Sequence, residues 1–153
     1  MGFAPLSIDE YLEIEAIKRL RIMYSHYFDM HRLDEMAELF TEDAVCEFGE
    51  QWGGDWVGRK MIREKYGTVA PAGAPPFIFM HANTNPWIEL TGPDSAKGRW
   101  YLLDLGLQPS NTNALTLVGV YDDVYKKVDG KWYIHRTRID FCWPRREYHG
   151  PRE

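Results

Sequence analysis

The sequence LTLVGVYDDVYKKV (residues 115–128), followed by Asp129-Gly130 and KWYIHRTRIDF (residues 131–141), sets the fold class of this chain. Both flanking segments are rich in β-branched and aromatic residues, which favour strands. The Asp-Gly pair is typical of a type I′ turn, because both central residues of that turn need a positive φ. We therefore predict a hairpin of two long antiparallel strands at 115–128 and 131–141.

Two further β-rich segments precede this hairpin, at residues 77–90 and 97–107. The turn-forming sequence Thr91-Gly-Pro-Asp-Ser95 separates them. All four predicted strands exceed the usual length of about 5–6 residues. Long antiparallel strands with helices ahead of them indicate a strongly curved sheet that wraps one helical layer, which is an α+β architecture.

The N-terminal part of the chain predicts helices. Ser7 and Glu10 have the spacing of a capping box, in which each side chain satisfies a free backbone amide of the other residue. An apolar stripe of helical period follows, and its members are Ile17, Leu20, Tyr24 and Tyr27/Phe28. We expect this first helix to end near Asp29.

Two shorter helices are expected before the sheet. The first is predicted to hold Leu33, Met36, Leu39 and Phe40. The next covers about residues 60–66, after a turn at Gly58. Residues 67–76, rich in Pro, Ala and Gly, form either a lid over a cavity or a long connection.

Composition narrows the class of protein. A length of 153 residues predicts a single domain spanning residues 1–153. Aromatic residues make up 14% of the chain, enough either to line a ligand cavity or to fill a ring-rich core. The net charge is −5 and the basic residues are scattered, so nothing resembles the basic stripe that binds nucleic acid.

Apolar runs, the N-terminal residues and the cysteines indicate where in the cell the protein works. No apolar run approaches the roughly 20 residues that span a bilayer, and residues 1–7 lack the features of a signal peptide. Cys46 and Cys142 lie far apart, which speaks against a disulfide framework. We expect a cytoplasmic protein that does not bind membranes.

Cofactor-dependent chemistry has no support in the sequence. Walker, GxGxxG and GxSxG motifs are absent. No metal-ligand spacing links the remaining histidines, which are His26, His31, His135 and His149. We therefore expect neither a cofactor nor a bound metal.

Asp29 stands at an unfavourable place for a carboxylate. The end of a helix carries negative partial charge, which costs an acidic side chain about 0.3–1 kcal/mol there. A residue that breaks a local rule without visible compensation is a candidate functional residue. The alternative is that Asp29 begins a turn, with His31 and Arg32 nearby.

His81 lies near the centre of the predicted strand 77–90, among apolar residues. Such a histidine is either a satisfied core residue or a base, because its pKa suits proton transfer near neutral pH. Asn83 shares its strand face and could support it.

Asp104 interrupts an apolar strand, on the face of Trp100 and Leu102. If that face is the inner one, burial should raise the pKa of Asp104 and make it a general acid. On the outer face it would be an ordinary exposed acid. Tyr24 and Tyr27 either pack in the core or offer a hydroxyl to a carbonyl oxygen in a cavity.

Several segments together resemble one known family. They are Ile14-Glu-Ala-Ile-Lys-Arg-Leu20, Tyr24, Asp29, Leu39-Phe-Thr-Glu-Asp-Ala-Val45, Gly58-Arg59, Gly98-Arg-Trp-Tyr101 and Gly130-Lys-Trp-Tyr-Ile134. This pattern, over roughly residues 14–141, is similar to the SnoaL-like family of the NTF2-like superfamily. The resemblance implies a conical α+β barrel with a deep pocket, and a homo-oligomer (a dimer or trimer).

Within that family the sequence most resembles the bile-acid 7α-dehydratases and, more distantly, the scytalone dehydratases. Their catalytic Tyr, Asp, His and Asp fall on Tyr24, Asp29, His81 and Asp104. The resemblance therefore implies a cofactor-independent lyase acting on a hydrophobic small-molecule substrate. In it His81 removes a proton, Asp29 fixes the tautomer of His81, Tyr24 binds the enolate oxygen and Asp104 protonates the leaving hydroxyl.

One position departs from the bile-acid pattern. Phe141 stands where those enzymes have a functional arginine, and Arg136, Arg138 and Arg145 are the candidate replacements. The aromatic segment 141–144 predicts a hydrophobic pocket wall suited to a steroid, terpenoid or aromatic skeleton. An isomerase using the same base, and a non-catalytic ligand-binding or docking module, are the alternatives, since the superfamily hosts both.

Overall fold

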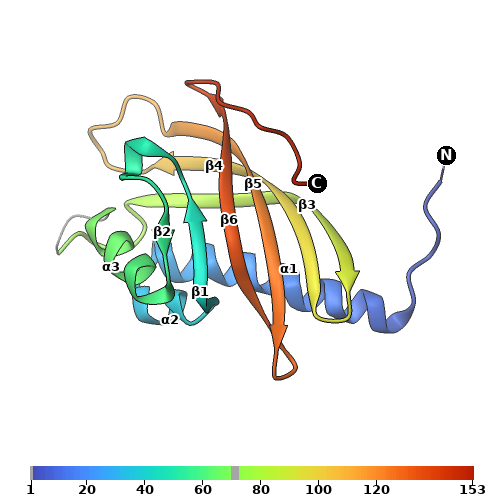
Figure 1. The fold of residues 1–153 in the computed structure, drawn as a ribbon. Coiled ribbons are helices and arrows are strands. Elements are labelled where there is room, and N and C mark those ends of the chain that lie inside the picture. The colour runs from blue at the N-terminus through green and yellow to red at the C-terminus, as the bar shows by residue number, and fades with distance from the viewer. Residues whose placement is uncertain (1, 70–72) are drawn as a thin grey trace.

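The computed structural model describes residues 2–69 and 73–153 as three α-helices, one short 3₁₀ helix (Glu50–Trp52) and a six-stranded sheet. The helices are α1 (Ile8–Asp29), α2 (Leu33–Ala37) and α3 (Arg59–Val69). The strands are β1 (Phe40–Glu47), β2 (Trp56–Val57), β3 (Phe79–Gly92), β4 (Ser95–Gly106), β5 (Leu115–Val128) and β6 (Lys131–Trp143). Figure 1 shows α1 crossing one face of the curved sheet, while α2 and α3 gather beside β1 and β2.

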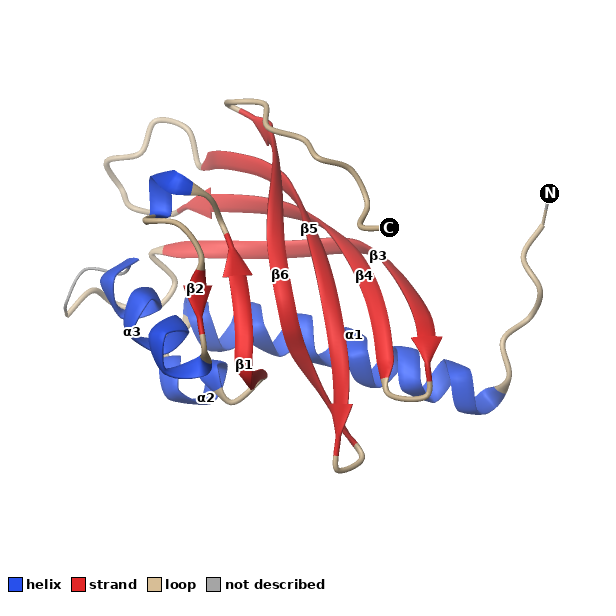
Figure 2. Cartoon of the chain, in the orientation of Figure 1, coloured by secondary structure: helices blue, strands red, loops and turns tan. Residues whose placement is uncertain are grey.

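The sheet has the order β2-β1-β6-β5-β4-β3 and is antiparallel except where β1 runs parallel to β6. The long strands β3 to β6 bend across α1, as Figure 2 shows. This confirms the predicted α+β class with a curved, mostly antiparallel sheet.

Local signals fixed most element boundaries. The Ser7–Glu10 capping box is present, with the Glu10 N–H donating to Ser7 Oγ at 3.2 Å and the Ser7 N–H donating to Glu10 Oε2 at 2.8 Å. Asp129 and Gly130 take φ values of 49° and 76°, as a type I′ turn requires. The four predicted long strands are all present, with ends within two residues of the predicted positions.

The second helix was predicted too long. It ends at Ala37, and Phe40 instead opens β1, where it pairs with Ile134 of β6. The Ile134 N–H donates to the Leu39 carbonyl at 2.9 Å, so this pairing holds residues 39 and 40 out of the helix. Because the partner lies far along the chain, the local apolar pattern could not reveal it, and β1 and β2 were not predicted at all.

The start of β3 also differs from the prediction. Phe77 has a φ of 59° and donates its N–H to the Asp29 carbonyl at 2.8 Å, so it belongs to the turn that ties this segment to the end of α1. The strand begins at Phe79, which places His81 third in β3 rather than at its centre. Of the predicted loop 67–76, residues 67–69 continue α3 and residues 70–72 lie outside the described part of the chain.

The core lies between α1 and the concave side of the sheet and is dominated by rings. Its buried members include Tyr24, Phe28, Phe40, Trp100 and Tyr121. Among the described residues, no helix is long and apolar enough to cross a membrane.

Candidate active site

A cavity that opens to solvent lies between α1, α3 and the inner face of the sheet, and the space within it is about 510 Å³ when open solvent is included. Apolar side chains form most of its wall, and these are Phe28, Phe48, Trp52, Trp56, Val69, Leu102, Leu117, Ile139 and Phe141. Its polar groups are Tyr24, Tyr66, His81, Asp104 and Tyr121. An apolar cavity with a few converging polar groups is the usual form of a small-molecule site.

Asp29 and His81 form a hydrogen-bonded pair, and the His81 ring lines this cavity. Asp29 is the last residue of α1 and is buried, while His81 comes from the edge strand β3. The Asp29 Oδ1 atom lies 2.6 Å from His81 Nδ1, and Asp29 Oδ2 accepts the backbone N–H of His81 at 2.9 Å. Both carboxylate oxygens therefore accept hydrogen bonds from His81, and these bonds offset the unfavourable position of a carboxylate at the C-terminal end of a helix.

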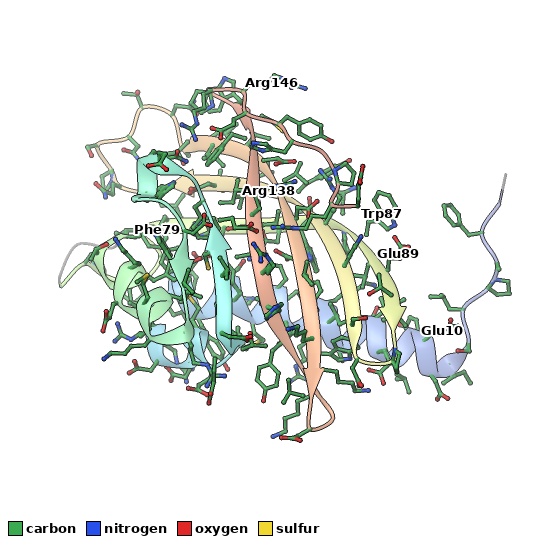
Figure 3. The ribbon with its side chains drawn as sticks, viewed as in Figure 1. Glu10, Phe79, Trp87, Glu89, Arg138 and Arg146 are labelled. Carbon is green, nitrogen blue, oxygen red and sulfur yellow. The ribbon has the colours of Figure 1, made fainter. Side chains whose placement is uncertain are left out.

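This pairing sets the tautomer of His81. An ionised carboxylate only accepts hydrogen bonds, so the 2.6 Å contact requires a proton on Nδ1 and leaves the Nε2 lone pair free in the neutral ring. The ring packs against Phe28 and Phe79, with centroids 4.9 Å and 5.4 Å away. Phe79 lies at the α3 end of β3 (Figure 3). His81 thus lines the cavity with a fixed ring and a nitrogen that can accept a proton.

Asp104 lies opposite His81 in the β3–β4 register and lines the cavity, so the face that it shares with Trp100 and Leu102 is the inner one, which the sequence left open. Its Oδ2 atom is 3.8 Å from His81 Nε2, and its side chain is 27% exposed. Burial raises the pKa of Asp104, and the neighbouring His81 only partly opposes this rise. A carboxyl whose pKa is raised by burial, beside a base, is suited to donate a proton.

Tyr24 lines the cavity, and its hydroxyl lies 2.5 Å from that of Tyr66 and 3.5 Å from that of Tyr121. Neither Tyr66 nor Tyr121 was predicted as a site residue. Tyr66 follows the buried Ile62 by one helical turn, and Tyr121 shares a strand face with Leu117. Helix and strand periodicity could therefore have placed both tyrosines on an inward face. Tyr27 packs against the core and does not line this cavity.

Asn83 does not support His81. Its Nδ2 donates to Ser25 Oγ at 2.6 Å, so the side chain is tied to α1, and the hydrogen bonds found in the described residues include none between Asn83 and His81. The prediction that Asn83 and His81 share a strand face was correct, but they contact different residues of α1, which are Ser25 and Asp29 respectively.

None of the three candidate arginines lines the cavity in the described part of the chain. Arg136 pairs with Glu47 at 2.6 Å, Arg138 with Asp140 at 3.1 Å and Arg145 with Glu147 at 3.0 Å. Phe141 itself is buried and lines the cavity, as predicted for an apolar wall. Of the described segment 141–144 only Phe141 lines the cavity, and Cys142 lines a groove on the other face of the sheet, as strand alternation requires.

Metal ligands do not cluster in this structure. Within residues 2–69 and 73–153, no three His, Cys, Asp or Glu side chains come close enough together to hold an ion. Among the described residues, the polar groups that line the cavity are one imidazole, one carboxyl and three phenolic hydroxyls, and the Asp29 carboxyl supports the imidazole from behind.

Comparison with known proteins relates this arrangement to others. A family model described as a SnoaL-like domain matches residues 9–138. The chain is similar to a Novosphingobium aromaticivorans protein provisionally named a scytalone dehydratase, with a TM-score of 0.78 and 23% identity over 94% of this chain and 97% of that one. A second protein from the same organism, provisionally named an aromatic ring hydroxylase, has a TM-score of 0.72 and 28% identity over 92% and 94%.

A protein of unknown function with a cystatin-like fold, from Nostoc punctiforme, has a TM-score of 0.72 and 19% identity over 92% of this chain and 97% of that one. The matches at 23% and 19% identity establish a shared fold, in which N-terminal helices pack into a curved sheet.

Proposed function

The chain belongs to the family of SnoaL-like domains, and from that premise we propose that it is a cofactor-independent lyase. It eliminates water from a hydrophobic, carbonyl-containing substrate by acid–base catalysis. The observation that carries this proposal is the Asp29–His81 pair, whose free Nε2 lies beside Asp104 at the wall of an apolar cavity.

The steps follow from the positions of these groups. His81 Nε2 takes a proton from the carbon next to a carbonyl, and Asp29 stabilises the imidazolium that forms. The electrons of the broken C–H bond first form an enolate. They then form the new C=C bond as the C–O bond breaks, and Asp104 gives its proton to the departing oxygen, releasing water. His81 then returns a proton to the Asp104 carboxylate across the 3.8 Å gap, which restores both groups.

Tyr24 completes this scheme by donating a hydrogen bond to the enolate oxygen. The apolar wall supports it, because charge interactions are stronger where water is excluded. The four residues are those on which the catalytic set of the bile-acid 7α-dehydratases falls, so the resemblance and the geometry point to the same groups.

The substrate we propose is a ring ketone with a hydroxyl group, of the steroid, terpenoid or polyketide type. The ring-lined cavity suits a flat skeleton, and the name of one structural neighbour, a scytalone dehydratase, fits this class. Phe141 in place of an arginine argues against a bile acid, since no cation in the described part of the cavity wall would meet a carboxylate tail.

Isomerisation is the second candidate, because removing a proton and returning it to another carbon needs the same base. The raised pKa of Asp104 favours elimination, which consumes a proton at the leaving oxygen. A non-catalytic docking module would need neither the tight Asp29–His81 pair nor the cavity.

A screen of hydrophobic β-hydroxy and vinylogous hydroxy ketones tests the proposal. Wild type should release water and form an unsaturated ketone of lower mass, and His81→Ala should lose about 10²–10⁴-fold in rate. His26→Ala, at an exposed position of α1, is the matched control and should keep wild-type activity. Equal turnover by wild type and His81→Ala would exclude His81 from the mechanism, while a product of unchanged mass would indicate an isomerase.

We also propose that the chain folds as one domain over residues 1–153 and assembles as a dimer or trimer. The outer face of β3 and β4 supports assembly, because Trp87 and Tyr101 stand 61% and 54% exposed there. Trp87 projects from β3 at the end away from Phe79 (Figure 3). Light scattering at micromolar concentration would decide the oligomeric state, and a monomer mass would refute this part.

A further inference from the structure

Three tyrosine hydroxyls meet at one end of the cavity, and the elimination scheme uses only one of them. Tyr24 comes from α1, Tyr66 from α3 and Tyr121 from β5. Their exposed fractions are only 1%, 3% and 2%, and their hydroxyls lie 2.5 Å (Tyr24–Tyr66) and 3.5 Å (Tyr24–Tyr121) apart. Three separate elements thus bring three donors to one point of a cavity that is otherwise mostly apolar.

Counting protons shows that this cluster lacks an acceptor. Each phenolic hydroxyl donates one hydrogen bond, so three protons are available for two contacts inside the cluster. The described residues provide these hydroxyls with no other hydrogen-bond partner. One O–H group is therefore left to point into the cavity, and buried polar groups of this kind normally have a partner. A ligand oxygen that accepts hydrogen bonds would supply it.

A buried cation lies behind two of these rings. Arg21 is fully buried, and its guanidinium carbon is 4.5 Å from the Tyr24 ring centroid and 3.9 Å from that of Tyr121. It is held there by Asp123 at 2.5 Å and by Thr137 Oγ1 at 2.8 Å. These bonds to β5 and β6 fix the guanidinium against the two ring faces, and Arg21 does not itself line the cavity.

The cation affects how the phenols behave as donors. Burial raises the pKa of Tyr24 and Tyr121 well above the usual value, and Arg21 opposes that rise in both. The hydroxyls consequently keep their protons near neutral pH, while the cation behind the rings makes them stronger donors to a negative oxygen.

We propose that Tyr66 and Tyr121 join Tyr24 in a three-hydroxyl site for an anionic ring oxygen, an enolate or phenolate, with Arg21 as a positioning residue acting through the rings. The site takes planar cyclic ketones whose enolate spreads its charge over a ring, and the phenols that are their stable analogues. This inference rests on the proposed elimination only for its role in turnover, because the binding of such an oxygen is a separate property.

Binding of para-nitrophenol tests the site without turnover, because its phenolate absorbs visible light. The neutral para-nitrotoluene has nearly the same shape and reports binding by the cavity alone. Wild type should bind the phenolate more tightly than the neutral ring. Tyr66→Phe and Tyr121→Phe should each weaken phenolate binding about tenfold or more, the usual effect of a hydrogen bond to a charged group, and leave para-nitrotoluene within about twofold. Tyr11→Phe, at an exposed position of α1, should change neither.

Arg21 needs a variant that leaves no unpaired charge. In Arg21→Met/Asp123→Asn both charges are removed, while the amide oxygen can still accept the Tyr125 hydroxyl that Asp123 accepts at 2.7 Å. This variant should lose phenolate affinity and keep affinity for para-nitrotoluene, and Arg21→Lys, which restores a cation, should recover part of the loss. Thermal unfolding of each variant confirms that the protein compared is folded.

The outcomes separate the two proposals. Phenolate affinity that is unchanged in both Tyr66→Phe and Tyr121→Phe would overturn the oxyanion site, and unchanged affinity in the Arg21→Met/Asp123→Asn protein would overturn the role of Arg21. His81→Ala should bind para-nitrophenol about as wild type does. If the elimination mechanism is wrong but the oxyanion site is right, phenolate affinity will still fall in Tyr66→Phe and Tyr121→Phe, while His81→Ala will turn over as fast as wild type.

Discussion

Replacing Asp29 by asparagine changes one functional group and leaves the shape of the side chain intact. In the native pair, Asp29 Oδ2 accepts the His81 backbone N–H at 2.9 Å and Oδ1 contacts Nδ1 at 2.6 Å. An amide nitrogen cannot accept, so the asparagine oxygen has to remain on the backbone N–H and its NH₂ group has to face Nδ1. Nδ1 then becomes the acceptor, and the ring proton moves to Nε2, the nitrogen that lies beside Asp104.

The size of the effect follows from what this tautomer blocks. With a proton on Nε2, the neutral ring can no longer remove one from the substrate, and the charge that stabilised the imidazolium is gone. General-base catalysis contributes about 10²–10⁴-fold, which corresponds to about 2.7–5.4 kcal/mol of activation free energy. In Ser-His-Asp triads the same substitution costs about 10⁴ in kcat. We therefore expect kcat to fall about 10³-fold, with KM changed by less than about threefold.

Two measurements check this expectation. Steady-state kinetics on the substrate found in the screen give kcat and KM, and nitrogen NMR of the imidazole shows which ring nitrogen carries the proton. Asp34→Asn is the matched control, because the Asp34 side chain is 83% exposed and pairs with Arg63 on the surface, away from the cavity. If Asp29→Asn places the proton on Nε2 and still turns over within threefold of wild type, His81 is not the base.

Two further substitutions test the electrostatics and the packing. Burial raises the pKa of Asp104, so between its ordinary pKa of 3.8 and the raised value the folded state binds more protons than the unfolded state, and stability falls as pH rises through that window. Asp104→Asn should therefore raise Tm relative to wild type at pH 8, with the gain shrinking toward pH 4; an equal gain at both pH values would contradict the shift. In Gly98→Ala the new Cβ would lie 2.7 Å from Ile88 Cδ1 and from Tyr125 Cε2, which should cost about 1–3 kcal/mol in urea unfolding. Gly2→Ala, with nothing within 4 Å of its Cβ, should be neutral, and an unchanged midpoint for Gly98→Ala would refute the overpacking.

Sequence alone determined the elements whose causes are local. The Ser7 capping box, the Asp129-Gly130 turn and the strand alternation that puts Asp104 on the face of Trp100 and Leu102 depend on residues a few positions apart, so the sequence alone predicts them. That this face is the inner one was decided by the tertiary structure. Asp29 was conspicuous because it broke the rule for a helix end, and the family resemblance joined it to His81.

Tertiary structure decided what depends on distant partners. The parallel pairing of Phe40 with Ile134, the attachment of Asn83 to α1 and the position of Arg21 against Asp123 join residues that are between 58 and 102 positions apart. The same holds for the meeting of Tyr24 with Tyr66 and Tyr121, because the sequence predicted a site role for Tyr24 alone. Periodicity tells which face of an element a side chain occupies, but the curvature of the sheet and the angle at which α1 crosses it determine which faces converge. That convergence brings the three tyrosine hydroxyls together in the cavity wall, with the buried Arg21 behind two of the rings.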